Sequence, residues 1–314
     1  MKIVNFVLLI IVIGSCSNPK KEYIQLQGEA QGTTFFISYY DSLQTDYSSD
    51  IEQILIDFDE ELSTYKSGSL INLFNNNEID SLPLPQKYFL TCYNLSENIK
   101  EYTNGYFNHG LQNLLTVSRE FEKRGEILPE ELRDSLHEIS TILVGDNFMM
   151  KLDKRTQFNF NAIAQGYSVD VISDFFESKG VNNYMVEIGG ELRVRGKSPS
   201  DKFWTVSLES PDSKVDNRSV QETISLESKA VVTSGSYRKY KEINGLKYSH
   251  AINPKTGLGV THNLLSVSVI TKKSAVADAL ATAFLVMGKE KTIQLLDSNN
   301  IDLIVMARYM QILS

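Results

Sequence analysis

The segment from Ala275 to Ala283 is rich in alanine and places one carboxylate, Asp278, four residues before one hydroxyl, Thr282. Residues four apart share a face of a helix, so both oxygen-bearing side chains would point the same way. Small neighbours allow another backbone or a ligand to approach closely, and carboxylate and hydroxyl oxygens are ligands that Mg²⁺ accepts. The segment therefore predicts either half of a metal site or a helix packed tightly against a sheet, with Asp278 hydrogen-bonded there.

The N-terminus indicates export. Lys2 precedes the apolar run Ile3–Ile13, which is too short to span a bilayer comfortably, and a Gly-Ser pair and Cys16 follow it. This pattern resembles a bacterial lipoprotein signal, in which the Cys becomes the first mature residue and carries lipid. The alternative is a plain secretory signal or a membrane helix. We expect residues 1–16 to be the signal, residues 17–22 a polar tether, and the protein to be anchored to a membrane of the cell envelope on its periplasmic face.

Cysteine usage and charge exclude several kinds of protein. With Cys16 lipidated only Cys92 remains, so no intrachain disulfide can form, and Cys92 is expected to be a buried, inert thiol in a helical stretch, Gln86–Tyr102. The net charge is -8 and the basic residues are scattered, so no stripe suited to nucleic acid is present. The four histidines are far apart in the sequence, which argues against a zinc site.

Apolar periodicity predicts an α+β fold with mixed or antiparallel sheets and packed helices. The absence of an internal repeat or a convincing linker favours one compact unit over residues 23–314. Two polar stretches, residues 75–85 and 210–219, are expected to be loops. The expected helices are Ile51–Leu62, Gln86–Tyr102 and Ala164–Ser178, and the expected strands are Thr33–Tyr40, Tyr184–Ile188, Leu192–Arg195, Phe203–Leu208, Leu265–Ile270 and Asp302–Ala307.

Two glycine-containing segments follow predicted strands. Gly189-Gly190 comes after Val186-Glu187-Ile188, and Thr233–Tyr237, with Ser234 and Gly235, comes after Ala230–Val232. Backbone N–H groups in such strand-end turns can face an anion, which suits a diphosphate. Strand-end glycines are also common in sheets that bind no ligand, and neither segment matches the dinucleotide fingerprint or the P-loop.

His250 lies in an apparent strand that runs into the Pro-Gly turn ending at Gly257. A histidine beside a turn can act as a base near neutral pH. Taken alone, the position equally fits a half-exposed strand histidine with a backbone partner.

Short blocks spread over nearly the whole mature chain carry a resemblance to one family. Together they resemble the FAD:protein FMN transferases, the ApbE family of flavin-transferring lipoproteins, whose order and spacing they follow. This resemblance implies an ApbE-like (T-fold-like) architecture. The blocks are Gln31–Phe35, Leu62–Tyr65 with Asn75, Asn104–Phe107, Ala162–Asp170, Gly189–Glu191, Thr233–Arg238, His250–Gly257 and Asp278–Thr282.

The resemblance also implies a reaction. Enzymes of this family bind FAD with Mg²⁺, cleave its diphosphate with release of AMP, and transfer FMN to a Thr or Ser hydroxyl of an acceptor flavoprotein or membrane redox subunit. By position, the metal ligands would be the Ala164 carbonyl and the side chains of Asp278 and Thr282, and His250 would take the proton from the attacking hydroxyl. The implied FAD-binding residues are Gln31, Thr33, Tyr65 as a stacking ring, Asn108, Gln165, Glu187, Gly189, Gly190, Ser234, Gly235 and Ile252.

Three positions depart from the family pattern. Asn108 and Asn253 stand where the family usually has Asp, and Gln165 stands where it usually has Lys. A neutral amide offers hydrogen bonds but no charge to a cation or a phosphate. Because the other implied catalytic and metal-binding residues are kept, we expect an active transferase. The alternatives are an FAD pyrophosphatase that passes FMN to water, and a lipoprotein that binds FAD without consuming it.

Overall fold

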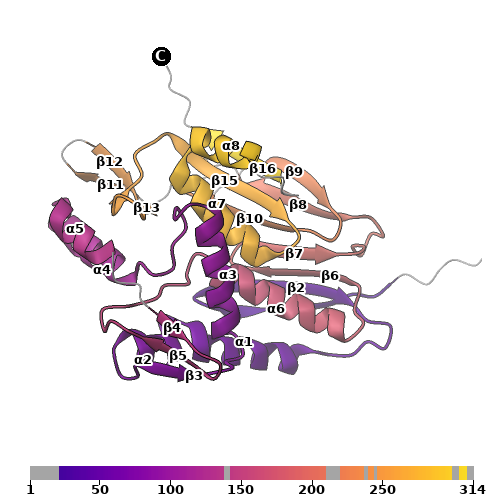
Figure 1. The fold of residues 1–314 in the computed structure, drawn as a ribbon. Helices are drawn as coiled ribbons and strands as arrows, with labels where there is room; N and C mark the ends of the chain where they lie inside the picture. The colour runs from indigo at the N-terminus through magenta and orange to yellow at the C-terminus, as the bar shows by residue number, and fades with distance from the viewer. Residues whose placement is uncertain are drawn as a thin grey trace, which may run out of the picture.

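The computed structural model describes residues 21–137, 142–209, 220–236, 240–243, 246–298 and 304–309. Its centre is a seven-stranded sheet in which all pairings between the described strands are antiparallel (Figure 1). Helices pack on this sheet, so the predicted α+β class with antiparallel sheets is confirmed. In spatial order the strands are β1 (Ile24–Ala30), β2 (Thr33–Tyr40), β6 (Asn183–Ile188), β7 (Glu191–Arg195), β10 (Ala230–Gly235), β15 (Leu264–Thr271) and β16 (Ile304–Tyr309).

Two helices position the candidate site. Helix α6 contacts β6 and β7, helix α7 contacts β10 and β15, and the two helices pack against each other. Helix α3 packs on the outer side of α7 (Figure 1). The described helices are α1 (Ser48–Leu62), α2 (Leu70–Asn75), α3 (Phe89–Tyr102), α4 (Gln112–Lys123), α5 (Glu130–His137), α6 (Ala164–Ser178), α7 (Ser274–Met287) and α8 (Lys289–Ser298).

Smaller sheets surround the central one. A three-stranded sheet lies beside α2, and the second half of the chain forms three two-stranded hairpins (Figure 1). The three-stranded sheet has the order β3 (Ser81–Pro83), β5 (Phe148–Lys151), β4 (Ile142–Val144), and the hairpins are β8 (Trp204–Glu209) with β9 (Val220–Leu226), β11 (Tyr240–Ile243) with β12 (Leu246–Ser249), and β13 (Ile252–Asn253) with β14 (Leu258–Gly259).

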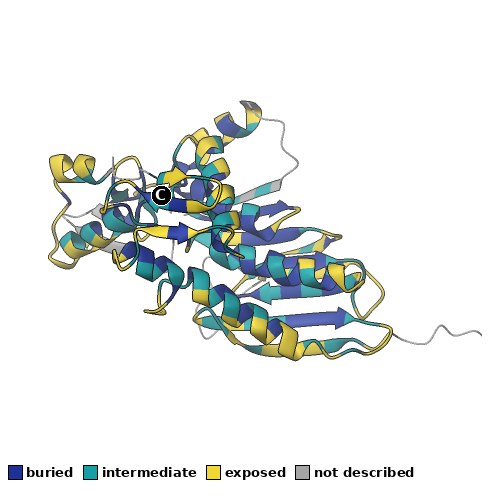
Figure 2. Ribbon diagram, turned by 60° about the horizontal axis from the view of Figure 1, so that its bottom comes forward, coloured by how far each residue is buried: buried dark blue, intermediate teal, exposed yellow. Residues whose placement is uncertain are grey.

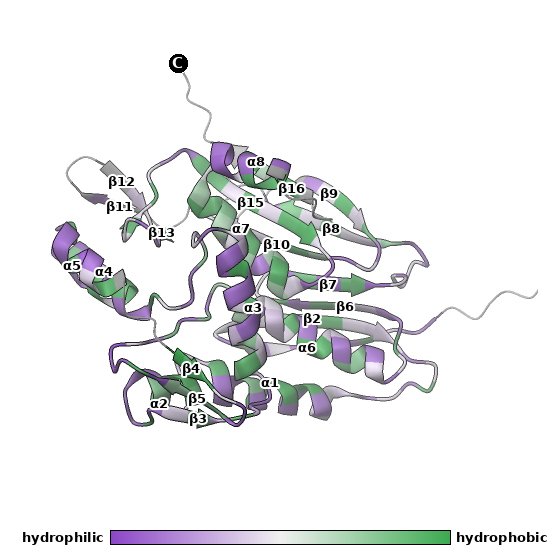
Figure 3. Ribbon diagram, in the orientation of Figure 1, coloured by the Kyte–Doolittle hydropathy of each residue, from purple (hydrophilic) through white to green (hydrophobic). Residues whose placement is uncertain are grey.

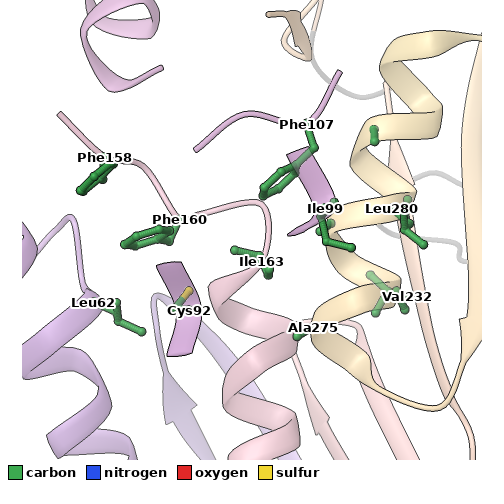
Figure 4. Packing of buried hydrophobic residues seen from close by; sticks show 14 of the residues in the cluster. Leu62, Cys92, Ile99, Phe107, Phe158, Phe160, Ile163, Val232, Ala275 and Leu280 are labelled. Carbon is green, nitrogen blue, oxygen red and sulfur yellow. The ribbon is translucent and has the colours of Figure 1, made fainter. Parts of the chain in front are cut away.

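Neighbouring residues of the central strands serve two different cores. On β10, Val232 joins the large cluster that contains α7, whereas Val231 joins a separate cluster with Trp204 of the β8–β9 hairpin. Successive side chains of a strand point to opposite faces of the sheet. A strand that is covered on both faces therefore carries apolar residues at consecutive positions. Figure 2 shows the resulting buried sheet, and Figure 4 shows the cluster between α3, α6 and α7.

Helix α7 is buried over almost its whole length. Twelve of its fourteen residues are buried, and Figure 3 shows it as mostly hydrophobic. Small residues make this possible, because α6 on one side and α3 on another approach the same short helix. The predicted tight packing of the alanine-rich segment is confirmed.

Most predicted elements recur in the structure. Thr33–Tyr40 and Ala164–Ser178 have the predicted bounds, and Cys92 is fully buried, where burial raises the pKa of its thiol. Two expectations were wrong. Residues 75–85, expected as a loop, contain strand β3, and residues 233–235, the first part of the expected turn over residues 233–237, are the last three residues of β10.

Several predictions fall outside the described residues. These are the lipidated Cys16, the signal over residues 1–16, most of the tether and the loop over residues 210–219. Among the helices that the structure describes, none combines the length and apolar character needed to span a bilayer.

Candidate functional site

The packing of α6 on α7 brings Asp278 to the first turn of α6. The Asp278 carboxylate accepts a hydrogen bond from the backbone N–H of Gly166, with an N–Oδ2 distance of 3.1 Å. A Cβ atom on Gly166 would lie 2.5 Å from the backbone oxygen of Ser274 and 2.8 Å from the Asp278 Cβ. Only glycine allows this approach, so the backbone of α6 and the Asp278 side chain are held in direct contact.

Asp278 and Thr282 share one face of α7, as their spacing predicts. Both line a pocket of about 350 Å³ that is also lined by Ser234 and Gly235 from the end of β10. The Thr282 hydroxyl lies 3.2 Å from the Ser234 hydroxyl. The pocket therefore offers one carboxylate and two hydroxyl groups, from α7 and the end of β10.

A second carboxylate, Glu191, lines the same pocket from the start of β7. Its Oε2 atom is buried and has no hydrogen-bond partner in the part of the chain that the structure describes. The sequence analysis included Glu191 in a family block but gave it no role. Its only signal was a charged residue directly after two glycines at a strand end.

Burial perturbs both carboxyl groups. It raises the pKa of Asp278 to about 7, against the opposing effect of the Gly166 N–H. The pKa of Glu191 is raised well above its ordinary value, first by burial and then by the charge of Asp278. Two such groups that disfavour simultaneous ionisation are typical of sites that bind a cation or handle protons.

His250 and Ile252 also line this pocket. His250 is exposed between β12 and β13, and Ile252 belongs to β13. Asn253 accepts a hydrogen bond from the Lys255 N–H at 2.9 Å, which shapes the turn after His250. The structure thus brings His250 and Asp278 to one pocket from distant parts of the sequence.

The three amide positions have local hydrogen bonds. Asn108 lines the pocket and accepts from the Gly110 N–H at 2.9 Å, and Gln165 donates to the carbonyl oxygen of Ile188 at 3.2 Å. Arg119 of α4 is the only lysine or arginine among the described residues that line the pocket. An anionic ligand here would meet one cationic side chain.

A second pocket, of about 160 Å³, adjoins the first, since Asn161 lines both. Gln31, Tyr65, Ala164 and Gln165 line it. Tyr65 is 86 % exposed, so one face of its ring is available to a planar ligand.

Gln31 is held by one hydrogen bond in this second pocket. Its Oε1 accepts from the Ser168 hydroxyl at 3.3 Å, and its Nε2 is buried without a partner among the described residues. An acceptor atom of a ligand would satisfy that amide.

The Gly189-Gly190 turn lies beside these pockets and lines neither of them. The Gly189 N–H donates to the Thr34 carbonyl oxygen at 3.0 Å, and the Gly190 N–H donates to Glu187 Oε1 at 2.7 Å. Both amides that the sequence suggested for an anion are used within the protein. The turn instead supports Gln165, whose amide nitrogen lies directly against Gly189 beside the Thr33 methyl group.

The donor set fits a divalent cation such as Mg²⁺. Within the described ranges no cluster of three or more His, Cys, Asp and Glu side chains that could hold a metal ion is present, so a cation here would be held by fewer carboxylates together with hydroxyl or carbonyl oxygens. The pocket instead offers hard oxygen atoms from Asp278, Glu191, Thr282 and Ser234, with Ala164 two residues before Gly166. Among the described residues neither Asp278 nor the buried Oε2 atom of Glu191 has a cationic partner, and a bound cation would explain this.

Fold and pocket together define an α+β protein with an acidic, hydroxyl-bearing pocket suited to a cation and a polar ligand. A family model described as the ApbE family matches residues 31–305. The chain therefore belongs to the ApbE family.

Relatives and solved structures agree with this placement. The chain is 31% identical over 312 residues to a Vibrio cholerae protein named FAD:protein FMN transferase, covering 95% of this chain and 91% of that protein. It is 30% identical over 317 residues to a Haemophilus influenzae protein of the same name, covering 96% and 91%. The flavin transferase ApbE from Vibrio cholerae superposes with a TM-score of 0.78 at 29% identity, over 93% of this chain and 95% of that one. The Pseudomonas stutzeri flavinyl transferase ApbE gives 0.80 at 28% identity, over 93% and 92%.

Proposed function

We propose that this chain is an FAD:protein FMN transferase that uses a divalent cation, Mg²⁺, and modifies a Thr or Ser hydroxyl of an acceptor protein. The observation that carries the proposal is the single pocket that buried Asp278, half-buried Thr282 and exposed His250 line together. The names of the relatives support the reaction class.

In the proposed reaction, the acceptor oxygen forms a bond to the phosphorus of the FMN half of FAD. The bond between that phosphorus and the bridging diphosphate oxygen breaks, and AMP leaves with the bridging oxygen. A bound Mg²⁺ supplies charge neutralisation at the diphosphate. Asp278, Thr282 and the Ala164 carbonyl would hold it.

His250 has the role of base. Its exposed position at the pocket wall lets an acceptor side chain approach from solvent, and its imidazole accepts the hydroxyl proton as the oxygen attacks. The exposed Tyr65 ring offers a surface on which a ring of FAD stacks, and Asn161 joins its pocket to the one that holds Asp278. A dinucleotide would therefore extend along both pockets.

The sequence supports a location for this activity. We propose that lipid on Cys16 anchors the protein at the periplasmic face of an envelope membrane, where exported flavoproteins or membrane redox subunits are the acceptors. Residues 17–22 would serve as the tether, and residues 23–314 would form the catalytic unit.

The test is intact-mass spectrometry of an acceptor domain bearing a Thr, after incubation with the full chain in detergent, FAD and Mg²⁺. We expect a mass gain of one FMN unit that is lost on chelation and with His250→Ala. Release of FMN and AMP with an unmodified acceptor would indicate a pyrophosphatase. Retention of intact FAD would indicate a binding protein, and either result would contradict the proposal.

A further inference from the structure

Glu191 stands out among the carboxylates near the pocket because one of its two oxygen atoms lacks a partner, although its own backbone N–H donates a hydrogen bond to the carboxyl group. Its buried Oε2 atom has no hydrogen-bond partner among the described residues. Glu187, on the preceding strand, shows the contrast, because its Oε1 accepts from the Gly190 N–H at 2.7 Å. A buried, unpaired carboxylate oxygen is costly, so its retention requires a partner that the chain does not supply.

The charged groups that act on Glu191 do not compensate it. Asp278 and Glu187 are the two that influence it, and both are carboxylates. The residues that line the same pocket include the Asp278 carboxylate and the hydroxyl groups of Thr282 and Ser234, and Arg119 is the one lysine or arginine among the described lining residues. The buried Asp278 carboxylate and the buried Oε2 atom of half-buried Glu191, with hydroxyl groups nearby, form an environment that a divalent cation satisfies and that a neutral or anionic ligand does not.

We propose that Glu191 is a second carboxylate of the cation site and holds the divalent cation together with Asp278. The inference rests on the proposed function and deepens it, because the family resemblance assigned the site only Asp278, Thr282 and the Ala164 carbonyl. A carboxylate can contact such an ion directly or through water. Either arrangement gives the Oε2 atom its missing partner and removes the repulsion between the two side chains.

The experiment measures binding of Mn²⁺, as a probe for Mg²⁺, to the full chain in detergent by electron paramagnetic resonance, without FAD and with it. Glu191→Gln keeps the size of the side chain and removes its charge. We expect it to weaken Mn²⁺ binding by about tenfold or more. Glu29→Gln, which changes an exposed carboxylate on β1, is the matched control and should bind Mn²⁺ like the wild type.

A second measurement separates a cation ligand from a structural residue. In EDTA, Glu191→Gln should unfold at the same temperature as the wild type or higher, because it removes a buried charge that faces Asp278. In saturating Mg²⁺ the wild type should gain more thermal stability than the variant. Weaker Mn²⁺ binding together with a lower unfolding temperature in EDTA would indicate a structural role and overturn the inference.

The remaining outcomes distinguish the two proposals. If Glu191→Gln binds Mn²⁺ like the wild type while Asp278→Asn does not, Glu191 is not a ligand and the proposed function stands. If the wild type binds no Mn²⁺ either with or without FAD, both the inference and the cation-dependent function fail.

Discussion

Two aspartates at the contact between α6 and α7 occupy equivalent places and have opposite surroundings. Asp170 on α6 accepts hydrogen bonds from the N–H groups of Ser274 and Ala275 at the start of α7, at 3.1 and 2.9 Å. Asp278 on α7 accepts one from the Gly166 N–H in the first turn of α6. Each carboxylate is about 95% buried, and each caps the other helix with the favourable sign for a helix N-terminus.

The two aspartates differ in the charged side chain that lies beside each of them. Asp170 meets the Arg193 guanidinium at 2.9 Å, and Arg193 also pairs with Asp174 and Glu177. Asp278 instead faces the carboxylate of Glu191 and has no salt bridge among the described residues. The same helix contact thus holds one aspartate that is paired with an arginine and one that has no cationic partner among the described residues.

Removing the Arg193 guanidinium that pairs with Asp170 should have the largest effect on stability. Arg193→Met leaves Asp170 buried without its guanidinium and should cost about 3–5 kcal/mol of unfolding free energy. Asp278→Asn, in EDTA, should cost nothing or stabilise slightly, because no cation is lost. Urea unfolding of both variants at neutral pH measures the contrast, and equal losses would show that the two aspartates do not differ.

Forcing α6 and α7 apart should have an intermediate effect on stability and should disturb the hydrogen bonds of both aspartates. Gly166→Ala places a Cβ within 2.5 Å of the Ser274 backbone oxygen, so α6 and α7 must move apart. Overpacking of this kind costs about 1–3 kcal/mol. The control is Gly68→Ala, where an added Cβ meets no atom within 4 Å. The unfolding temperature and the affinity for Mn²⁺ should both fall in Gly166→Ala, and both should stay unchanged in Gly68→Ala.

The last test of the contrast is the pH dependence of stability. In the cation-free protein, the pKa of Asp278 rises from an ordinary 3.8 to about 7, so the folded state binds its proton more tightly than the unfolded chain does. This stabilisation is complete below about pH 4 and is lost as pH rises through about 7. Urea midpoints measured in EDTA from pH 4 to 8 should therefore fall less steeply with Asp278→Asn than with the wild type. Parallel curves would contradict the raised pKa.

The sequence predicted local features of the fold well. Helix α6 has apolar residues at helical spacing and Gly180 two residues beyond its end, so its bounds follow from neighbouring residues alone. Strand β3 was missed, because its three residues form a strand only by pairing with β5, far along the chain. The end of β10 was read as a turn, although Ser234 and Gly235 pair with β15.

The candidate site shows the same division. The spacing of Asp278 and Thr282 on one helix face could be predicted, since it depends only on helical geometry. The position of Glu191 beside Asp278 could not, because it arises from the order of β7, β10 and α7 in space. Likewise, the Gly190 N–H looked available in the sequence, and only the structure shows that Glu187 uses it.

The burial of α7 sets how the proposed activity would be lost on heating. Local openings of a protein start in exposed segments, whereas a helix with twelve of fourteen residues buried exchanges its amide hydrogens only when the surrounding core opens. Asp278 and Thr282 therefore cannot fray away from the pocket independently. Heat inactivation should coincide with global unfolding, and the amides of α7 should be among the slowest to exchange with deuterium.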